Sequence, residues 1–111
     1  MIIDFKNLEE VAKPNFKGGE KEFLVKTADD GKVKIMHGLL KPGSSIGYHK
    51  HEGNCEIIYV LSGHGHVLYD DGEEEVHAGQ VHYCPMDHSH SLINNGPDDL
   101  VFLGIVPEHK L

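Results

Sequence analysis

Arginine is absent from this chain of 111 residues, and all ten basic residues are lysines. Because a lysine ammonium is a point charge, the sequence offers no guanidinium fork for two-point contacts with a phosphate or a carboxylate. Acidic residues outnumber basic residues by 18 to 10, and the formal charge at pH 7 is −8. Phosphate backbones and anionic lipids repel a negatively charged domain, so we expect no nucleic acid and no membrane as a partner.

Long apolar runs and clustered cysteines are also lacking. No apolar run approaches the roughly 20 residues of a membrane-spanning helix. Charge appears as early as Asp4, so we expect no signal peptide. The two cysteines, Cys55 and Cys84, lack the Cys-x-x-Cys spacing. These features favour a cytoplasmic protein with two reduced, buried and unreactive thiols, with one structural disulfide as the alternative.

Thirteen glycines and five prolines divide the chain into short apolar runs. Asp30-Gly31 and Asp71-Gly72 are typical of hairpin turns, and the runs recur at a spacing of roughly 8–12 residues. This pattern predicts an all-β sandwich or barrel of the Greek-key or jelly-roll type. The exception is residues 7–12, where we expect one or two helical turns capped by Asn7 and ended by Pro14.

Histidine is unusually abundant, and eight of the ten histidines lie between His49 and His90. On a strand, His49 and His51 share one face with Cα atoms about 6.5–7 Å apart, so both imidazoles can reach one metal ion. By the same alternation Lys50 points to the other face. Glu56 opens an apolar run, where burial of a carboxylate is unfavourable unless it is paired or binds a cation. A turn before Glu56 would bring it beside the histidine pair, with His90 as the candidate third imidazole.

Each of these features alone also has an ordinary structural interpretation. A His-x-His pair is often two surface histidines, and a glutamate at the start of a strand is usually exposed. Three histidines and a glutamate flanked by apolar strands favour a metal site. We expect the histidines that lack this spacing to be hydrogen-bonded or exposed strand residues: His64, His66, His77 and His82.

The first half of this histidine cluster resembles the first sequence motif of the cupins, G-x5-H-x-H-x(3,4)-E-x6-G. Every fixed position of the motif is filled, by Gly43, His49, His51, Glu56 and Gly63. The spacing between these five residues leaves no gap or insertion.

The second cupin motif, G-x5-P-x-G-x2-H-x3-N, is matched by Gly79, Pro85, His90 and Asn94. Asp87 stands where the family has glycine, and we expect the swap to be tolerated because aspartate adopts left-handed backbone conformations more readily than most residues.

The resemblance implies a double-stranded β-helix, or jelly-roll barrel, formed by a single domain over residues 1–111 with its motif-bearing core at about 43–94. It also implies a metal bound by His49, His51, Glu56 and His90. His88 lies near the same turn, but the motif spacing selects His90 as the ligand. His88 and Tyr59 are candidates for catalytic residues of the pocket. Small cupins often pair through their sheets, which implies a homodimer.

Three imidazoles and a carboxylate suit one divalent transition metal per subunit, namely Fe, Mn, Ni, Co, Cu or Zn, better than Ca or Mg. The family includes dioxygenases, isomerases or lyases, and also non-catalytic sugar-binding and sensor modules. We therefore expect a small metalloenzyme acting on a small oxygenated metabolite, with a non-catalytic binding protein as the alternative. Without arginine, and with Lys50 turned away, the expected ligand is neutral or weakly anionic.

Overall fold

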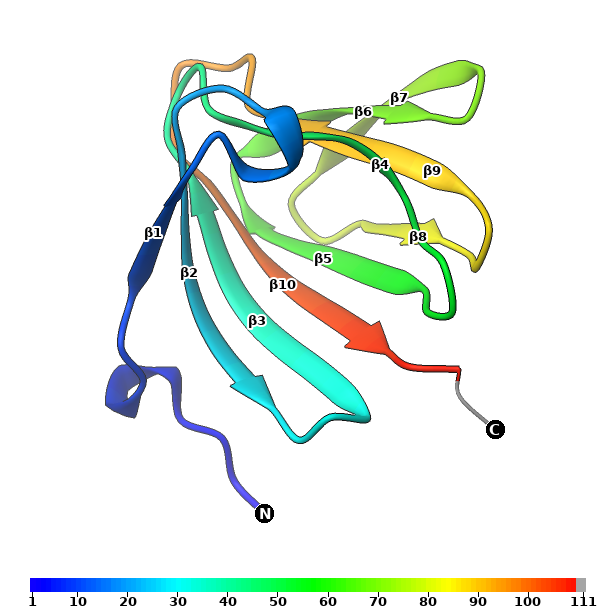
Figure 1. Cartoon of the computed structure of the whole chain (residues 1–111). Coiled ribbons are helices and arrows are strands. Elements are labelled where there is room, and N and C mark those ends of the chain that lie inside the picture. Colours follow the sequence, from blue (N-terminus) through cyan, green and yellow to red (C-terminus); the bar gives the residue numbers. More distant parts are fainter. Residues whose placement is uncertain (110–111) are drawn as a thin grey trace.

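Two antiparallel sheets face each other across the core (Figure 1), in a computed structural model that describes residues 1–109. The six-stranded sheet has the order β1-β2-β3-β10-β5-β8, with the bounds β1 Val11–Pro14, β2 Glu22–Asp29, β3 Val33–Leu40, β10 Leu100–Pro107, β5 Glu56–Ser62 and β8 Val81–Cys84. The four-stranded sheet has the order β4-β9-β6-β7, with the bounds β4 Ser45–Lys50, β9 Ser89–Ile93, β6 His64–Tyr69 and β7 Gly72–His77. The predicted all-β jelly roll is thus confirmed.

Strict alternation along β10 shows how the sequence builds this barrel. Leu100, Phe102, Gly104 and Val106 are buried, and the residues between them are half-buried. Phe102 stacks on Phe23 with the ring centroids 5.8 Å apart. Farther along β10, Gly104 faces Met36 and a carboxylate oxygen of Glu56. Because Gly104 has no side chain, the Met36 side chain and the Glu56 carboxylate fit against β10 at this position, and a polar group is admitted into the barrel.

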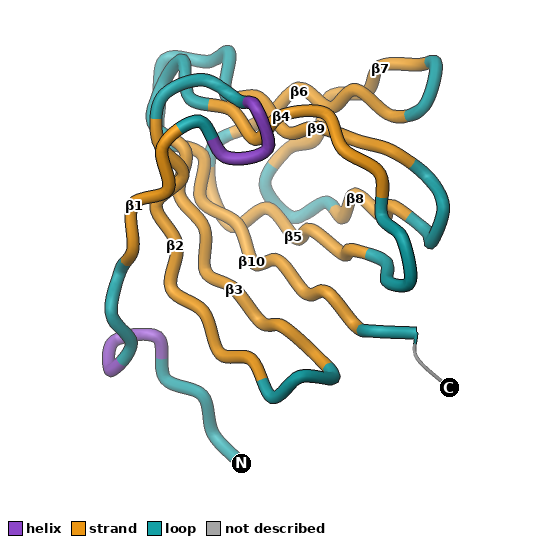
Figure 2. The backbone as a smooth tube through the Cα atoms, viewed as in Figure 1, coloured by secondary structure: helices purple, strands orange, loops and turns teal. Residues whose placement is uncertain are grey.

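The N-terminal helical turn is a single 3-10 turn and lies earlier than predicted (Figure 2). It covers Phe5–Asn7 (η1), and the side chain of Asp4 accepts a hydrogen bond from the backbone N–H of Lys6. Residues 11–14 form strand β1, in which Val11 pairs with Val25 of β2. The prediction of a helix over residues 7–12 was wrong because strand pairing outweighed a weak local signal. A second 3-10 turn, η2 (Phe16–Gly18), follows β1.

The turns follow the sequence with one shift. Gly31 has a positive φ of 86° between β2 and β3, as its turn signal predicts. The β6–β7 turn is made by Asp70 and Asp71, one residue earlier than predicted, because Gly72 pairs with Tyr69. Asp87 adopts a φ of 71°, so aspartate is accommodated where the family has glycine.

Among the described residues, no helix is long and apolar enough to cross a membrane.

Candidate metal centre

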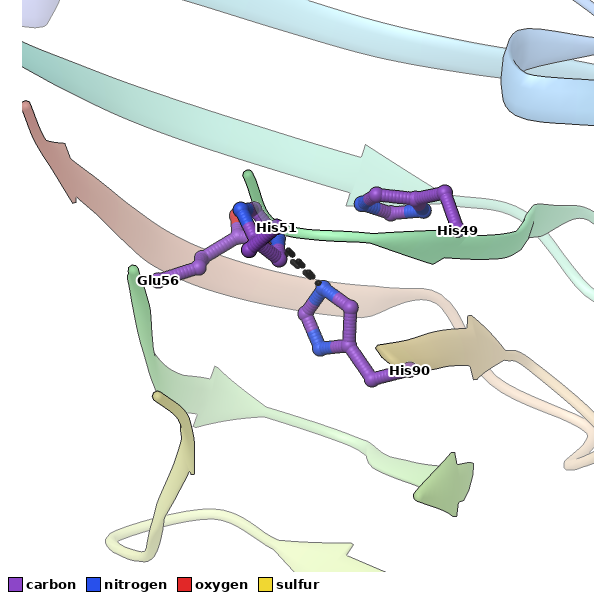
Figure 3. A group of neighbouring side chains, drawn as sticks. All are labelled: His49, His51, Glu56 and His90. Carbon is purple, nitrogen blue, oxygen red and sulfur yellow. Dashed lines mark hydrogen bonds and ion pairs between the residues drawn. The ribbon is translucent and has the colours of Figure 1, made fainter. Parts of the chain in front are cut away.

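The four predicted ligands come together inside the barrel (Figure 3). One ligand atom from each of His49, His51, Glu56 and His90 lies within 4.8 Å of the others. Nε2 of His51 is 2.9 Å from Nε2 of His90, and Oε1 of Glu56 is 3.2 Å and 3.0 Å from these two nitrogens. His51, Glu56 and His90 are buried and His49 is half-buried, so the cluster is largely removed from water.

Strand register explains why residues so distant in the sequence meet. His49 on β4 lies directly opposite His90 on β9. His51 follows the end of β4, and the turn that comes next, in which Gly53 has a φ of 74°, reverses the chain into β5 at Glu56. The alternation expected from His-x-His and the turn expected before Glu56 are both present.

Hydrogen bonds orient all three imidazoles in the same sense. Nδ1 of His49 lies 2.8 Å from the carbonyl oxygen of Gly47, which can only accept, so this nitrogen carries the proton. Nδ1 of His51 is 2.7 Å from Oδ1 of Asn54, and Nδ1 of His90 is 3.0 Å from Nε2 of His82. With each Nδ1 engaged elsewhere, the Nε2 atoms are the ones presented to the cluster.

The close contacts within the cluster shift the pKa values of Glu56 and His51 in opposite directions. Burial alone raises the pKa of Glu56, but hydrogen bonds from His51 and His90 outweigh it and lower the pKa to about 2. Burial lowers the pKa of His51, but its hydrogen bonds to Glu56 and Asn54 outweigh that effect and leave the pKa raised. A buried carboxylate surrounded by imidazole nitrogens therefore needs a positive charge among them, which is either a proton or a metal ion.

This donor set fits a transition metal. Imidazole nitrogens suit Fe, Mn, Ni, Co, Cu and Zn, whereas Ca and Mg take shells of oxygen ligands. The residues that would hold the ion are His49, His51, Glu56 and His90. All four atoms lie close enough to contact a single centre.

His82 has a place at the site that the sequence analysis missed. It is 6% exposed, its Nε2 faces Nδ1 of His90, and its ring stacks on that of His90 with the centroids 5.1 Å apart. Burial, and the nearby charge of His90, lower the pKa of His82 to about 4. The missed signal is the alternation of β8, which exposes Val81 and Tyr83 and buries His82. His82 thus keeps His90 in the orientation that presents Nε2.

The two candidate catalytic residues lie outside the cluster. His88 is on the turn before β9, where its Nδ1 is 2.6 Å from a carboxylate oxygen of Asp70 and its side chain is 43% exposed. Tyr59 alternates with the buried residues Ile58 and Val60 and is 39% exposed on the outer face of β5. Neither position supports a direct role at the metal centre.

The remaining histidines that lack ligand spacing lie along the β6–β7 hairpin. His64 stacks on His77, its partner in the strand register, with ring centroids 5.6 Å apart. Nδ1 of His66 is 2.6 Å from a carboxylate oxygen of Glu75. These three agree with the expectation of ordinary strand residues, whereas His82 does not.

Both cysteines are buried and unpaired. Burial raises the pKa of Cys84 to about 12, so the reactive thiolate form is strongly disfavoured. Sγ of Cys55 is 3.2 Å from Nε2 of His109. The alternative of a disulfide between the two is not realised in the structure.

A cavity of about 260 Å³ opens beside the cluster and is lined by His49, His51 and Glu56. Lys50 also lines it, so the prediction that this lysine faces away from the site was wrong. Lys50 is the last residue of β4, and its long side chain reaches the rim, where Nζ is 4.0 Å from Glu52. Sites for small molecules commonly have about 300–1,000 Å³, so this cavity suits a ligand of few atoms.

A larger hollow of about 590 Å³ lies beside β7 and β8. Its lining includes His82, Glu74 and Glu75, but it includes none of the four clustered ligands. We therefore place the functional site in the smaller cavity, whose lining includes three of the four ligand residues.

Comparison with known proteins agrees with the fold and the motifs. The family model described as "Cupin domain" matches residues 36–106. An oxalate-binding protein of Thermotoga maritima is 40% identical to this chain, over 83% of this chain and 81% of the relative. A crystal structure from the same organism, named a predicted oxalate decarboxylase, is 31% identical and superposes with a TM-score of 0.91 over 97% of this chain and 99% of that one.

A second solved structure shares the fold alone. It is named a sugar phosphate isomerase of the cupin superfamily from Silicibacter pomeroyi, and it is 18% identical with a TM-score of 0.80 over 97% of this chain and 76% of that one. The family model spans more than half of the sequence, and the first relative exceeds 30% identity over most of both chains. The chain therefore belongs to the cupin family.

Proposed function

We propose that this protein binds one divalent transition metal through His49, His51, Glu56 and His90 and uses it to bind a small dicarboxylate such as oxalate. The observation that carries the proposal is the common orientation of the three imidazoles, each of which engages Nδ1 outside the cluster and leaves Nε2 for the ion, with Nε2 of His51 and His90 beside the buried carboxylate. When bound, the metal supplies positive charge and open coordination positions for oxygen donors.

The choice of ligand rests on the relatives and on the cavity. The relative at 40% identity is named an oxalate-binding protein, and the structure at 31% identity is named a predicted oxalate decarboxylase. The cavity of about 260 Å³ suits a ligand as small as oxalate. This ligand carries more charge than the neutral or weakly anionic one expected from the sequence.

Binding without turnover is the first candidate, and the name of the relative at 40% identity supports it. Besides the ligands, the titratable residues that line the cavity are lysines and Glu52, whereas His88 and Tyr59 are not part of the lining. Catalysis at the same centre, by dioxygenase or by isomerase or lyase chemistry, is the second candidate. The name of the relative at 31% identity supports it.

The test measures metal content and oxalate binding on the same preparation. The protein is stripped, reloaded separately with Mn²⁺, Co²⁺, Ni²⁺ or Zn²⁺, and passed through gel filtration before elemental analysis. We expect about one ion per chain and calorimetric binding of oxalate to the loaded protein alone. Because oxalate chelates free metal, the metal content is measured again after the titration.

Equal binding of oxalate to loaded and stripped protein would refute the proposal, as would failure to retain any of the four ions. Assays for formate and carbon dioxide, under air and under argon, decide between the two candidates. Product formation by the loaded protein would favour catalysis, and binding without product would favour a binding protein.

We also propose that the protein is a homodimer. Neighbouring strands β5 and β8 expose large apolar side chains on their outer face, with Tyr59 opposite Val81 in the register. The exposed fractions are Tyr59 39%, Leu61 46%, Val81 55% and Tyr83 52%. A contiguous neutral, apolar patch at the last strand of a sheet is suited to a second copy of itself.

Light scattering at micromolar concentration should give twice the chain mass of 12.3 kDa. Val81→Lys should shift the protein toward the monomer, because the variant places a charge in the proposed interface. Val11→Lys is the matched control, since Val11 is a similarly exposed valine on β1, at the opposite edge of the sheet. A wild-type particle of single-chain mass would contradict the dimer.

A cytoplasmic location is likewise a proposal. Its support is the pair of free, buried thiols of Cys55 and Cys84, since proteins of oxidising compartments commonly pair their cysteines. Fractionation of cells that produce the untagged protein would test it.

A further inference from the structure

Four of the ten lysines line the cavity beside the metal centre: Lys13, Lys17, Lys34 and Lys50. The carboxylates in the same lining are Glu52 and the metal-centre residue Glu56. Lysines therefore outnumber carboxylates here, although the whole chain carries a formal charge of −8. The local charge around the cavity is opposite in sign to that of the protein.

Strand β1 and the connection that follows it hold two of these lysines at the cavity, Lys13 on β1 and Lys17 in η2. Nζ of Lys13 lies 5.0 Å from the ring centroid of Phe16, and Nζ of Lys17 lies 5.6 Å from it. Lys17 has a positive φ of 56°, a conformation that is unfavourable for a residue with a side chain. The loop keeps it because the backbone packs closely on β4, where a methyl group on Gly47 would overlap the carbonyl oxygen of Lys17.

Lys34 is placed by strand alternation. It lies on the same face of β3 as the buried residues Met36 and Leu40, which is the face turned into the barrel. Lysine is rarely placed on an inward face unless its charge has a partner. The two carboxylates in the cavity lining are engaged elsewhere: Glu52 lies beside Lys50, and Glu56 is buried among histidines.

We propose that Lys13, Lys17, Lys34 and Lys50 form a cationic entrance that makes the centre selective for dianions, namely small dicarboxylates, over neutral ligands of the same metal. The inference rests on the proposed function, because it assumes that a metal binds in the cluster. Since lysines act as point charges and not as rigid forks, they attract the dianion while the metal centre orients it. A clustered positive field raises the association rate in a salt-dependent manner.

The test compares a dianion with a neutral ligand on the same metal-loaded protein. Oxalate and imidazole are titrated into Co²⁺-loaded wild type, Lys17→Met, Lys34→Met and the double variant, at low and at high salt. At low salt, we expect the affinity for oxalate to fall about threefold in each single variant and about tenfold in the double variant. The affinity for imidazole should stay unchanged. High salt should shrink the difference between wild type and variants.

Matched controls separate charge from structure. Lys41→Met removes the same charge from an exposed position just beyond the other end of β3, about 20 Å away along the strand, and should leave oxalate affinity unchanged. Lys17→Arg and Lys34→Arg keep the charge and should retain oxalate binding. Metal content is measured for each variant.

Two outcomes would overturn the cationic entrance. The first is an oxalate affinity of the double variant equal to that of Lys41→Met. The second is an equal loss of affinity for oxalate and for imidazole in both the methionine and the arginine variants, which would show that the lysines support the structure of the cavity and do not act through their charge. If wild type retains no metal, or binds neither probe when loaded, the proposed function itself fails, and that result is distinct from both.

Discussion

Replacing His51 by alanine should weaken metal binding by more than about a hundredfold. Loss of a hydrogen-bonding partner behind a ligand typically costs about 10–100-fold in affinity, and loss of the ligand itself costs more. His51 is buried, and its Nε2 faces both Glu56 and His90. Its removal also leaves Glu56 with one fewer hydrogen-bond donor. Competition with a chromophoric chelator would measure the affinity of the wild type and of the variant.

His77→Ala is the matched control, because His77 is an exposed histidine on β7. We expect it to keep the wild-type affinity. The same proteins can be heated with and without metal, since an ion that binds only the folded chain adds about 4 kcal/mol when present at a thousand times its Kd. A metal-dependent rise in melting temperature as large in His51→Ala as in the wild type would contradict the assignment of His51 as a ligand.

Acidification of the metal-stripped protein from pH 6.5 to pH 4 should reduce the free energy of unfolding by about 3 kcal/mol through His82. Burial, and the nearby charge of His90, lower the pKa of His82 to about 4 from an ordinary value of 6.5. The unfolded chain therefore binds a proton below pH 6.5, whereas the folded chain does so only near pH 4. Stability is full above pH 6.5 and is lost as the pH falls through this window.

Three neighbouring groups, His49, His51 and Glu56, also make the free energy of unfolding depend on pH. Burial also lowers the pKa of His49, so His49 adds to the loss below pH 6.5. The raised pKa of His51 contributes stability that is present below pH 6.5 and lost as the pH rises above it. Glu56 has a pKa of about 2 against an ordinary 4.5, so its contribution is lost as the pH falls from about 4.5 toward 2.

Urea unfolding of stripped protein at pH 7.5, 6, 5 and 4, followed by circular dichroism, measures this dependence. His82→Gln keeps a polar side chain behind His90 but removes the titrating group, so its stability should fall less between pH 6.5 and 4. His66→Gln serves as a control on the β6–β7 hairpin, where His66 pairs with Glu75. Identical pH profiles for wild type and His82→Gln would exclude His82 as the source.

The sequence alone was sufficient to predict the family, the fold class and the residues that meet in the cluster. The reason is that the fixed spacing of the two motifs identifies the family, and that the first three ligands are close together in the sequence. Two histidines separated by one residue share a strand face, and a short turn returns Glu56 to the same place. The motif spacing also selected His90 over His88, and the structure brings His90, not His88, into the cluster.

Only the tertiary structure decided which side chains surround that cluster. His82 lies behind His90, but β8 and β9 belong to different sheets, and no local spacing reports a contact between sheets. Pairing with β2 turned residues 11–14 into a strand where the local sequence suggested a helix. The lysines at the cavity come from β1, η2, β3 and the end of β4, so their grouping depends on how the barrel closes, which strand alternation within one segment cannot reveal.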